Sequence, residues 1–400
     1  MIKIFNHNSD RLNGLDHLRA MAILLVMVFH FGKDIPSWLE PVKQIGWTGV
    51  DLFFVLSGYL IGDQLLREIK NANKISLKRF YIKRFFRIVP AWVAVLILYY
   101  SMPNLREGAG MPPLWRFITF TQNYGLNAQT QNSFSHAWSL CIEEQFYLLL
   151  PITIITIFYF KIQRGTIYLI LALIIIGFAL RLYSWNEYVQ PFIENGDRRE
   201  MVYGFIEKIY YPGYNRMDGL TIGVGIAAIF GFKPKIKGFL TQYGNTALIG
   251  GFGVFIFAYT FCNNFISYKT AIYGFPLFSI AYGLMVISAV SPTSVLYRFK
   301  SGITLIIATL SYSIYLTHKQ LYYLTKIGIE KLGFETTGVW TFWICIIIAL
   351  IGGFILYFVV EKPFLGLRKK ILEQVRENKE SSGLMILKPM KSKVNEKAGP

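Results

Sequence analysis

Long apolar stretches recur along the whole chain and alternate with short polar segments. Many of these stretches approach the ~20 residues that an α-helix needs to cross the hydrocarbon core of a bilayer. Helices of soluble proteins seldom stay apolar over such a length, because one of their faces usually meets water. The pattern therefore predicts an all-α, polytopic membrane protein. We expect about ten transmembrane helices, at residues 18–32, 47–62, 85–103, 136–160, 166–185, 211–231, 244–262, 271–291, 303–322 and 337–360.

The composition agrees with this class of protein. Of the 400 residues, 54% are hydrophobic and 16% are charged, and the mean hydropathy is +0.41. A typical soluble domain carries roughly 25% charged residues. We therefore expect a multi-pass protein that is integral to the cytoplasmic (inner) membrane of the cell.

The net charge of +18 is distributed unevenly. If both termini are cytoplasmic, 27 of the 41 lysines and arginines fall in cytoplasmic segments and ten in outer loops. Cytoplasmic loops of membrane proteins carry an excess of these residues, so the distribution supports an even number of spans with both termini inside. Because topology explains the charge, no nucleic-acid partner is needed. The oligomeric state is not indicated by the sequence.

The chain divides into two parts. Residues 1–370 are predicted to form one transmembrane domain, and residues 371–400 a flexible, basic cytoplasmic tail. We expect no soluble catalytic domain at either end of this sequence, so that any chemistry takes place in the membrane part. The three cysteines, Cys141, Cys262 and Cys345, have no paired spacing, and we expect neither a disulfide framework nor a metal site.

Two ionisable residues, Arg19 and His30, stand eleven positions apart in the first apolar segment. Eleven helical steps return to nearly the same face, about 16 Å further along the axis. Such residues are costly inside a membrane and indicate a functional site. His30 is a natural general base, and Arg19 is suited to bind phosphate. The alternative is that Arg19 reaches lipid headgroups and that His30 is an ordinary polar residue near the outer face.

A basic segment at 78–87 places Arg84 and Arg87 on one helical face. It has two interpretations. Positive charges before a span commonly anchor it on the cytoplasmic side. The same arginines could instead form a clamp for a polyphosphate, through paired guanidinium contacts.

The segment 136–147 carries the most specific pattern. His136, Ser139, Glu143 and Tyr147 have spacings that place them on one helical stripe, whereas Glu144 points elsewhere. We expect Glu143 to face a polar cavity and Glu144 to take part in a structural hydrogen bond or ion pair. The alternative for both acids is a buried ion pair that holds helices together.

Further buried charges need partners. Asp51 and Asp218 lie in apolar segments, and either Arg181 or Arg216 could pair with them. We favour a structural role for these pairs, while Asp51 also stays a candidate for binding substrate.

Together these segments resemble the acyltransferase 3 family of integral membrane acyltransferases, in order and over almost all of residues 11–366. The resemblance implies about ten spans and transfer of an acyl group, usually acetyl, from cytoplasmic acyl-coenzyme A to a hydroxyl of a carbohydrate or related molecule. The motifs that carry it are Leu15-Asp16 with Arg19 and His30, residues 49–59, Arg84 and Arg87 followed by Pro90, residues 136–147, 216–219 and 311–318, and Glu361-Lys362-Pro363-Phe364.

This sequence differs from the pattern of the family in two respects. Some members carry a fused extracytoplasmic hydrolase-like domain of the SGNH type, which we do not expect here. His17 stands where the family often has glycine, and we assign it no role.

These expectations combine into one mechanism. Acetyl-coenzyme A is the acyl-donor co-substrate, no cofactor is permanently bound, and Arg19, Arg84 and Arg87 hold the donor's phosphates. His30 removes the proton of the acceptor hydroxyl, and Glu143 orients His30. The candidates for substrate binding are His136, Ser139, Glu144, Tyr147 and Asp51. The alternatives are a carrier or flippase for a glycan or small solute, and a purely structural membrane subunit.

Overall fold

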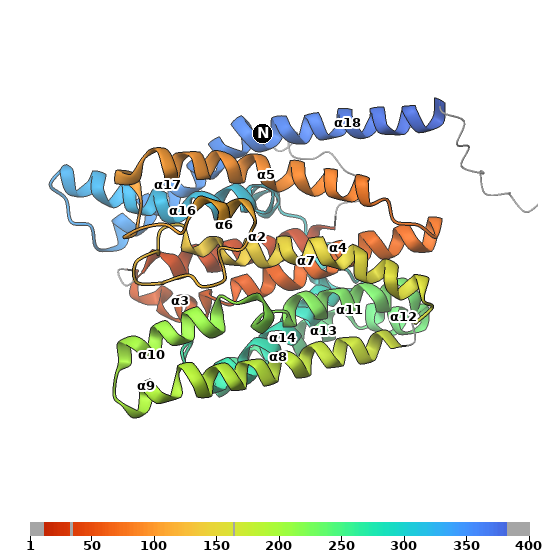
Figure 1. Ribbon diagram of the computed structural model, residues 1–400, viewed down its shortest axis with the longest axis horizontal. Helices are drawn as coiled ribbons and strands as arrows, with labels where there is room; N and C mark the ends of the chain where they lie inside the picture. The colour runs from red at the N-terminus through yellow and green to blue at the C-terminus, as the bar shows by residue number, and fades with distance from the viewer. Residues whose placement is uncertain (1–11, 33–34, 163–164, 382–400) are drawn as a thin grey trace, which may run out of the picture.

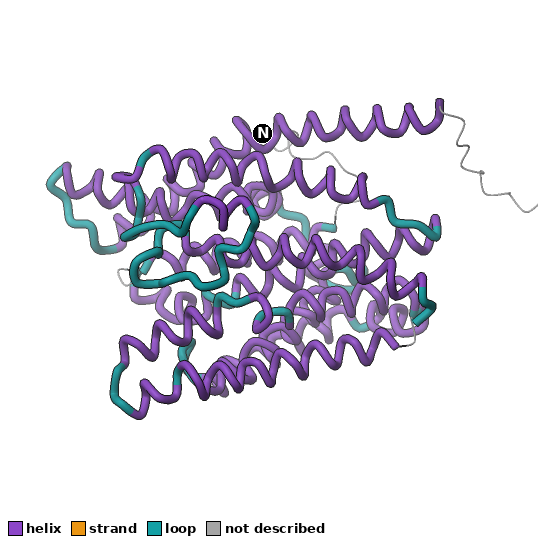
Figure 2. Tube along the Cα trace, in the orientation of Figure 1, coloured by secondary structure: helices purple, strands orange, loops and turns teal. Residues whose placement is uncertain are grey.

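The computed structural model describes residues 12–32, 35–162 and 165–381, and all regular secondary structure in these ranges is helical (Figure 2). The all-α class predicted from the sequence is therefore confirmed. The long helices are α2 (Asn13–Phe31), α4 (Gly49–Ala72), α5 (Leu77–Ser101), α7 (Trp138–Tyr159), α8 (Thr166–Tyr188), α11 (Asp218–Phe232), α13 (Gly244–Cys262), α14 (Phe275–Ala289), α16 (Gly302–Lys331), α17 (Val339–Leu356) and α18 (Lys362–Ser381).

Short helices connect the long ones. The short α-helices are α3 (Glu40–Gly46), α6 (Leu114–Ile118), α9 (Gln190–Glu194), α10 (Arg198–Phe205), α12 (Pro234–Gln242) and α15 (Val295–Arg298). Single 3₁₀ turns form η1 (Ser37–Leu39), η2 (Pro103–Leu105), η3 (Ser135–Ala137) and η6 (Gly213–Asn215), and π-helical turns form η5 (Ile206–Tyr210), η7 (Thr270–Gly274) and η8 (Tyr357–Glu361).

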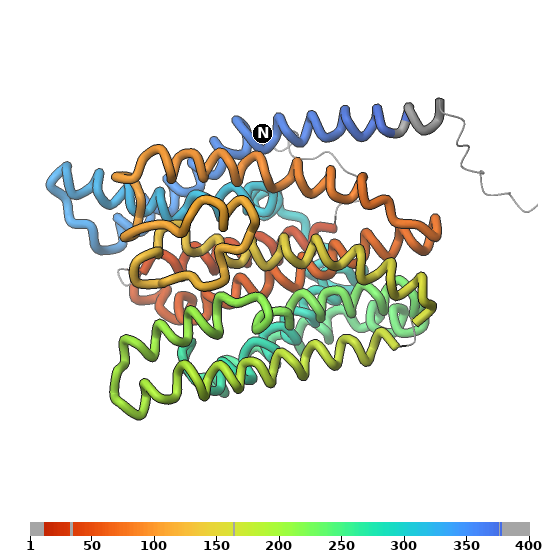
Figure 3. The backbone as a smooth tube through the Cα atoms, viewed as in Figure 1, coloured from red at the N-terminus to blue at the C-terminus, as the bar shows by residue number. Residues whose placement is uncertain are grey.

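The long helices run in broadly the same direction and form one bundle, with α5 and α18 along one edge and α8 along the opposite edge (Figure 1). Helix α2, red in Figure 3, lies between these edges and packs against α4, α14 and α16. The sequence segment with Arg19 and His30 is therefore in the interior of the bundle.

Seven of the described helical segments are long and apolar enough to cross a membrane. The bent pair α11 and α12, which meet at 110°, raises the number to eight if they form one span. Helix α5 covers the expected span 85–103 up to Ser101, and α16 contains the expected span 303–322, but neither helix is among these candidates. The count of about ten spans and the cytoplasmic location of the termini stay predictions.

The expected span at 211–231 starts later than the sequence suggested. Residues 211–217 form a turn around η6, and α11 begins only at Asp218. Pro212 stands just before η6 within this turn, and it has no backbone N–H to offer to a helix. The turn brings Asn215 and Arg216 into the interior as fully buried residues.

Helices α4 and α11 pack closely because each carries a glycine at the contact. A Cβ atom at Gly58 would collide with the backbone of Leu220, and one at Gly223 would collide with the backbone of Val55. Small residues allow such close approach of membrane helices. Ser57, which belongs to the site described below, is the neighbour of Gly58 on α4.

Contacts at both ends fix how α2 lies against α16. At one end the two nitrogens of His17 lie 2.7 Å from Thr304 Oγ1 and 2.9 Å from the carbonyl oxygen of Phe299. At the other end Tyr322 donates a 3.3 Å hydrogen bond to the carbonyl of Met27. These contacts determine which residue of α16 faces His30.

The last described segment of the chain is a single helix, α18. The boundary expected between residues 370 and 371 falls within α18, which extends to Ser381. Residues 382–400, where most of the expected tail lies, are outside the described residues.

Candidate active site

Three histidines from separate elements meet inside the bundle: His30 at the end of α2, His136 in η3 and His318 in α16. Their ring centroids are 4.9 to 5.8 Å apart. His318 Nε2 and His30 Nδ1 are 3.0 Å apart, which is hydrogen-bond distance. His30, which is half-buried, therefore faces polar groups within the bundle.

His136 is the least satisfied member of this histidine cluster. It is only 2% exposed, and neither of its ring nitrogens has a hydrogen-bond partner among the described residues. The rings of Phe134 and Tyr315 lie 5.1 and 5.5 Å away. Buried polar groups are nearly always hydrogen-bonded, so unpartnered nitrogens indicate a place where a ligand or water is bound.

A positive charge lies beside the histidines. Lys319 Nζ donates a 3.3 Å hydrogen bond to Ser135 Oγ and is 3.8 Å from Glu107 Oε1. Its charge acts on all three imidazoles. Glu107 also accepts a 2.9 Å hydrogen bond from the backbone N–H of Phe134, which ties the loop before η3 to α16.

A second cluster surrounds Glu143. Its Oε2 atom accepts hydrogen bonds from Tyr147 Oη at 2.6 Å and from Ser57 Oγ at 3.0 Å. The guanidinium of Arg84 lies 5.2 Å from the centre of the Tyr147 ring. The charges of Arg84 and Arg19 both act on the Glu143 carboxylate. Residues from α2, α4, α5 and α7 thus converge on one carboxylate.

Ser139 and Tyr315 connect the two clusters. The hydroxyls of Ser139 and Tyr315 are 2.6 Å apart, and Tyr315 donates a 2.7 Å hydrogen bond to the carbonyl of His136. The stripe of His136, Ser139, Glu143 and Tyr147 therefore runs along η3 and α7 from the histidine cluster to the Glu143 cluster. Arg19 and His30 belong to different clusters, on the same helix.

The sequence predicts that Glu143 orients His30. None of the hydrogen bonds found in the described part of the chain joins Glu143 to His30. The imidazole of His30 instead meets His318. The orienting role of Glu143 stays a prediction.

The two arginines of the basic segment differ in their partners. Arg87 forms an ion pair with Glu361, whose other oxygen accepts a 2.8 Å hydrogen bond from Ser313 Oγ. Arg84 keeps a buried Nε without a hydrogen-bond partner among the described residues. Its charge also acts on the half-buried Glu144. Arg84 is therefore the arginine of this pair with the clearer capacity to bind a ligand.

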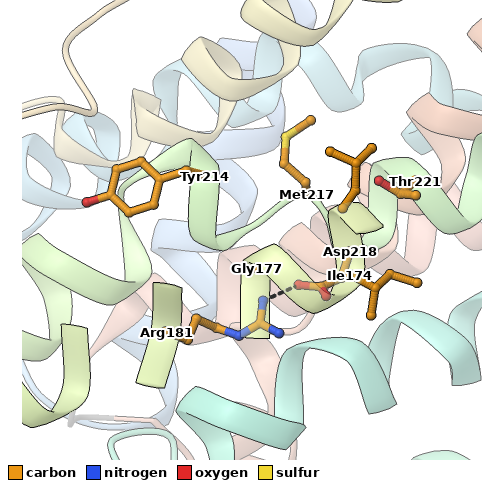
Figure 4. Close-up of a pocket in the computed structure, with 8 residues that line it drawn as sticks. Ile174, Gly177, Arg181, Tyr214, Met217, Asp218 and Thr221 are labelled. Atoms are coloured by element: carbon orange, nitrogen blue, oxygen red, sulfur yellow. Dashed lines mark hydrogen bonds and ion pairs between the residues drawn. The ribbon is translucent and has the colours of Figure 1, made fainter. Parts of the chain in front are cut away.

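The remaining buried acids pair with arginines. Asp16 Oδ1 lies 3.8 Å from Arg19 Nη1 within α2, and two further pairs involve Asp51 and Asp218. Arg216 Nη2 lies 2.8 Å from Asp51 Oδ1, and Arg181 Nη1 lies 2.7 Å from Asp218 Oδ2 (Figure 4). Arg181 also donates a 2.9 Å hydrogen bond to the carbonyl of Asn215. The sequence left open which arginine joins which aspartate, and the structure gives the pairing.

Sequence reasoning did not assign a site role to His318, Lys319 or Glu107. A signal was present for the first, because Ser311, Tyr315 and His318 repeat at helical spacing on one face. Lys319 was visible only as a basic residue within an expected span. In the described ranges, no group of three or more His, Cys, Asp or Glu side chains is arranged to hold a metal ion.

Comparison with known proteins gives a consistent result. A protein of Staphylococcus aureus (strain COL) whose name is given as "Putative O-acetyltransferase" is 30% identical over 330 residues, which cover 76% of this chain and 50% of that protein. The O-acetyltransferase OatA of Staphylococcus aureus (strain NCTC 8325 / PS 47) is 29% identical over 326 residues, which cover 77% of this chain and 50% of OatA. The chain thus spans about half the length of the curated relatives it matches. No solved structure matches the chain.

The family model for the acyltransferase domain matches residues 12–358, a range that contains both clusters and every candidate site residue. This match extends over most of the chain. The protein therefore belongs to the acyltransferase 3 family and is a multi-pass integral membrane protein.

Proposed function

We propose that this chain is an O-acetyltransferase that moves an acetyl group from acetyl-coenzyme A to a hydroxyl of a carbohydrate or glycan, with His30 as the general base. Family membership supports the reaction class, and the names of the Staphylococcus aureus relatives support acetyl as the group transferred. The observation that carries the proposal is the position of His30. It shares a helix with Arg19 and lies in a cluster of histidines inside the bundle.

The transfer needs one base and no acyl-enzyme. A ring nitrogen of His30 takes the proton of the acceptor hydroxyl while the hydroxyl oxygen attacks the thioester carbonyl carbon. The new C–O bond forms as the C–S bond breaks, and the bonding electron pair leaves with sulfur. The thiolate then takes the proton from the His30 imidazolium. The products are an acetyl ester and coenzyme A.

The donor's phosphates would be held by arginines at the Glu143 cluster. Arg84 and Arg19 contribute charges from α5 and α2, and a guanidinium binds phosphate oxygens through two parallel hydrogen bonds. In this arrangement the phosphates lie toward Arg84 and the thioester toward His30. The Arg19–His30 separation of about 16 Å along a helix suits the long pantetheine arm of coenzyme A.

The acceptor would meet His136, because both of its ring nitrogens are buried and available. Arg84 and Arg87 lie in the chain's most basic expected cytoplasmic segment, so we place the donor on the cytoplasmic side of the cytoplasmic membrane. The charges of Asp51 and Asp218, which a carrier could use to line a solute path, are paired with Arg216 and Arg181, although Asp51 Oδ2 and two nitrogens of each guanidinium have no hydrogen-bond partner among the described residues. Membership of the acyltransferase family favours the enzyme over the carrier.

Purified protein in proteoliposomes should release free thiol from acetyl-coenzyme A labelled with ¹⁴C in the acetyl group, and should pass the label to cell-envelope glycan fractions. His30→Ala should abolish label transfer while binding of the labelled donor persists, because the phosphate contacts are elsewhere. Label transfer by His30→Ala at the wild-type rate would remove His30 as the base. Solute movement without donor consumption would establish the carrier instead.

A further inference from the structure

His318 is held by its own helix in a defined tautomer. Its Nδ1 atom lies 2.8 Å from the carbonyl oxygen of Tyr315 and 3.2 Å from that of Ile314. A carbonyl oxygen only accepts hydrogen bonds, so Nδ1 carries the hydrogen. In a neutral imidazole the other nitrogen, Nε2, is then an acceptor.

The surroundings of His318 favour the neutral ring. The residue is fully buried in α16, and the charged amine of Lys319 lies next to it in the chain. A second positive charge at this place would be unshielded by water and would face repulsion. The other titratable groups near the ring are His30 on α2, His136 in η3, and Tyr315 and Tyr322 on α16, whose ring centroids each lie 5.8 Å from that of His318. Glu107, in the loop before α6, is already paired with Lys319.

Two acceptors bear on the tautomer of His30: Nε2 of His318 and the backbone carbonyl of Val26, one turn earlier on α2. The acceptor Nε2 of His318 lies 3.0 Å from His30 Nδ1, so a hydrogen bond requires the hydrogen to be on His30 Nδ1. The lone pair of His30 is then on Nε2. We infer that His318 is a positioning residue that holds His30 in the Nδ1–H tautomer and so makes His30 Nε2 the atom that receives the acceptor proton.

This inference rests on the proposed function of His30. It assigns to a neutral histidine, backed by the Tyr315 carbonyl, the task that a carboxylate performs in a Ser-His-Asp triad. When His30 becomes an imidazolium during transfer, its Nδ1–H still donates to the same acceptor. Glu143, whose Oε2 already accepts from Ser57 and Tyr147, is not needed for this task.

Three substitutions of His318, by leucine, glutamine and glutamate, test the inference in the reconstituted acetyl-transfer assay. His318→Leu removes the acceptor, and its kcat should fall by roughly 10³-fold or more, because triad enzymes lose about 10⁴-fold when the tautomer is wrong. The KM for acetyl-coenzyme A should stay within about threefold of the wild type, since the donor's phosphates lie elsewhere. His318→Gln can offer an amide oxygen near the place of Nε2, and it should recover at least about tenfold of the kcat lost in the leucine variant.

The control is His17→Leu. His17 also connects α2 to the start of α16, through Thr304 and the carbonyl of Phe299. It lies at the opposite end of α2 from His30 and the histidine cluster. It should lose thermal stability like His318→Leu, yet keep kcat within about threefold of the wild type, because it does not reach the base.

The pH dependence of kcat/KM is a measurement that a purely structural role of His318 would not change. His318→Glu would place a carboxylate acceptor beside His30 Nδ1, and the acidic limb of kcat/KM should move to higher pH. An unchanged kcat in His318→Leu, an equal loss in His17→Leu, or a glutamine variant no better than leucine would overturn the inference. Absence of acetyl transfer by the wild type would instead overturn the proposed function.

Discussion

Tyr315 on α16 donates its hydroxyl hydrogen to the backbone carbonyl of His136 across 2.7 Å. The same hydroxyl oxygen lies 2.6 Å from Ser139 Oγ, so the serine must be the donor in that second hydrogen bond. Tyr315 therefore holds η3 and the start of α7 against α16. This is the contact that keeps the ring of His136 beside those of His30 and His318.

Tyr315→Phe should lower kcat by about tenfold, the effect of losing a buried hydrogen bond worth ~1.4 kcal/mol in the transition state. The phenylalanine preserves the ring contact with His136 but frees its carbonyl, so the histidine cluster loses its fixed geometry. The KM for acetyl-coenzyme A should not change, because the arginines are unaffected. Steady-state kinetics in proteoliposomes would measure both values.

Tyr282→Phe is the matched control for Tyr315→Phe. Tyr282 is also a buried tyrosine of the bundle, and its hydroxyl bonds to Thr48 Oγ1 at 2.6 Å, away from the histidines. It should lose a similar amount of thermal stability with kcat unchanged. If the two variants lost kcat equally, the special role of the Tyr315 contact would be refuted.

Arg84 and Arg87 should behave differently when they are mutated. Arg84→Ala should raise the KM for acetyl-coenzyme A by at least about tenfold, since a charge-assisted hydrogen bond contributes ~1.5–3 kcal/mol. Arg87→Ala should mainly destabilise the fold by about 3–5 kcal/mol, because it leaves the buried Glu361 carboxylate without its cation. Donor titrations and thermal unfolding of the two variants separate these effects.

A double variant provides the control for this pair. Arg87→Met with Glu361→Gln removes both charges, and it should recover most of the stability lost in Arg87→Ala. If the double variant binds the donor as well as the wild type, Arg87 is structural. A loss of donor affinity that persists after stability is restored would assign Arg87 to the phosphate clamp, as the sequence alone suggested.

The parts of the site that sequence could predict are those on a single helix. The period of an α-helix fixes that Arg19 and His30 share a face, and that His136, Ser139, Glu143 and Tyr147 do so as well. The apolar runs likewise place every long helix that carries these residues. These relations need no knowledge of how one helix packs against another.

The parts that sequence could not predict depend on packing between helices. His318 meets His30 because contacts such as the one between His17 and Thr304 set how α2 lies along α16. Ser57 reaches Glu143 because α4 packs against α7 as well as against α11. A shift of one helical turn would replace either partner, and no local pattern in the chain excludes such a shift.

The pair of Asp51 and Arg216 tests whether a buried charge binds substrate or supports the fold. Both residues are almost inaccessible, and the guanidinium of Arg216 also lies 3.7 Å from the centre of the Phe275 ring. Asp51→Leu should destabilise the protein by about 3–5 kcal/mol, because it leaves the arginine charge uncompensated in the interior.

Asp51→Leu combined with Arg216→Met should be close to the wild type in stability, because an apolar pair of similar volume avoids the desolvation of two charges. If the pair is structural, kcat and both KM values per folded protein should also return to wild-type values in the double variant. Thermal unfolding and acetyl-transfer kinetics on the same preparations would measure this recovery. A double variant that is stable but has a raised KM for the glycan would instead assign the Asp51–Arg216 pair to substrate binding, because a lost contact with the acceptor would then explain the defect.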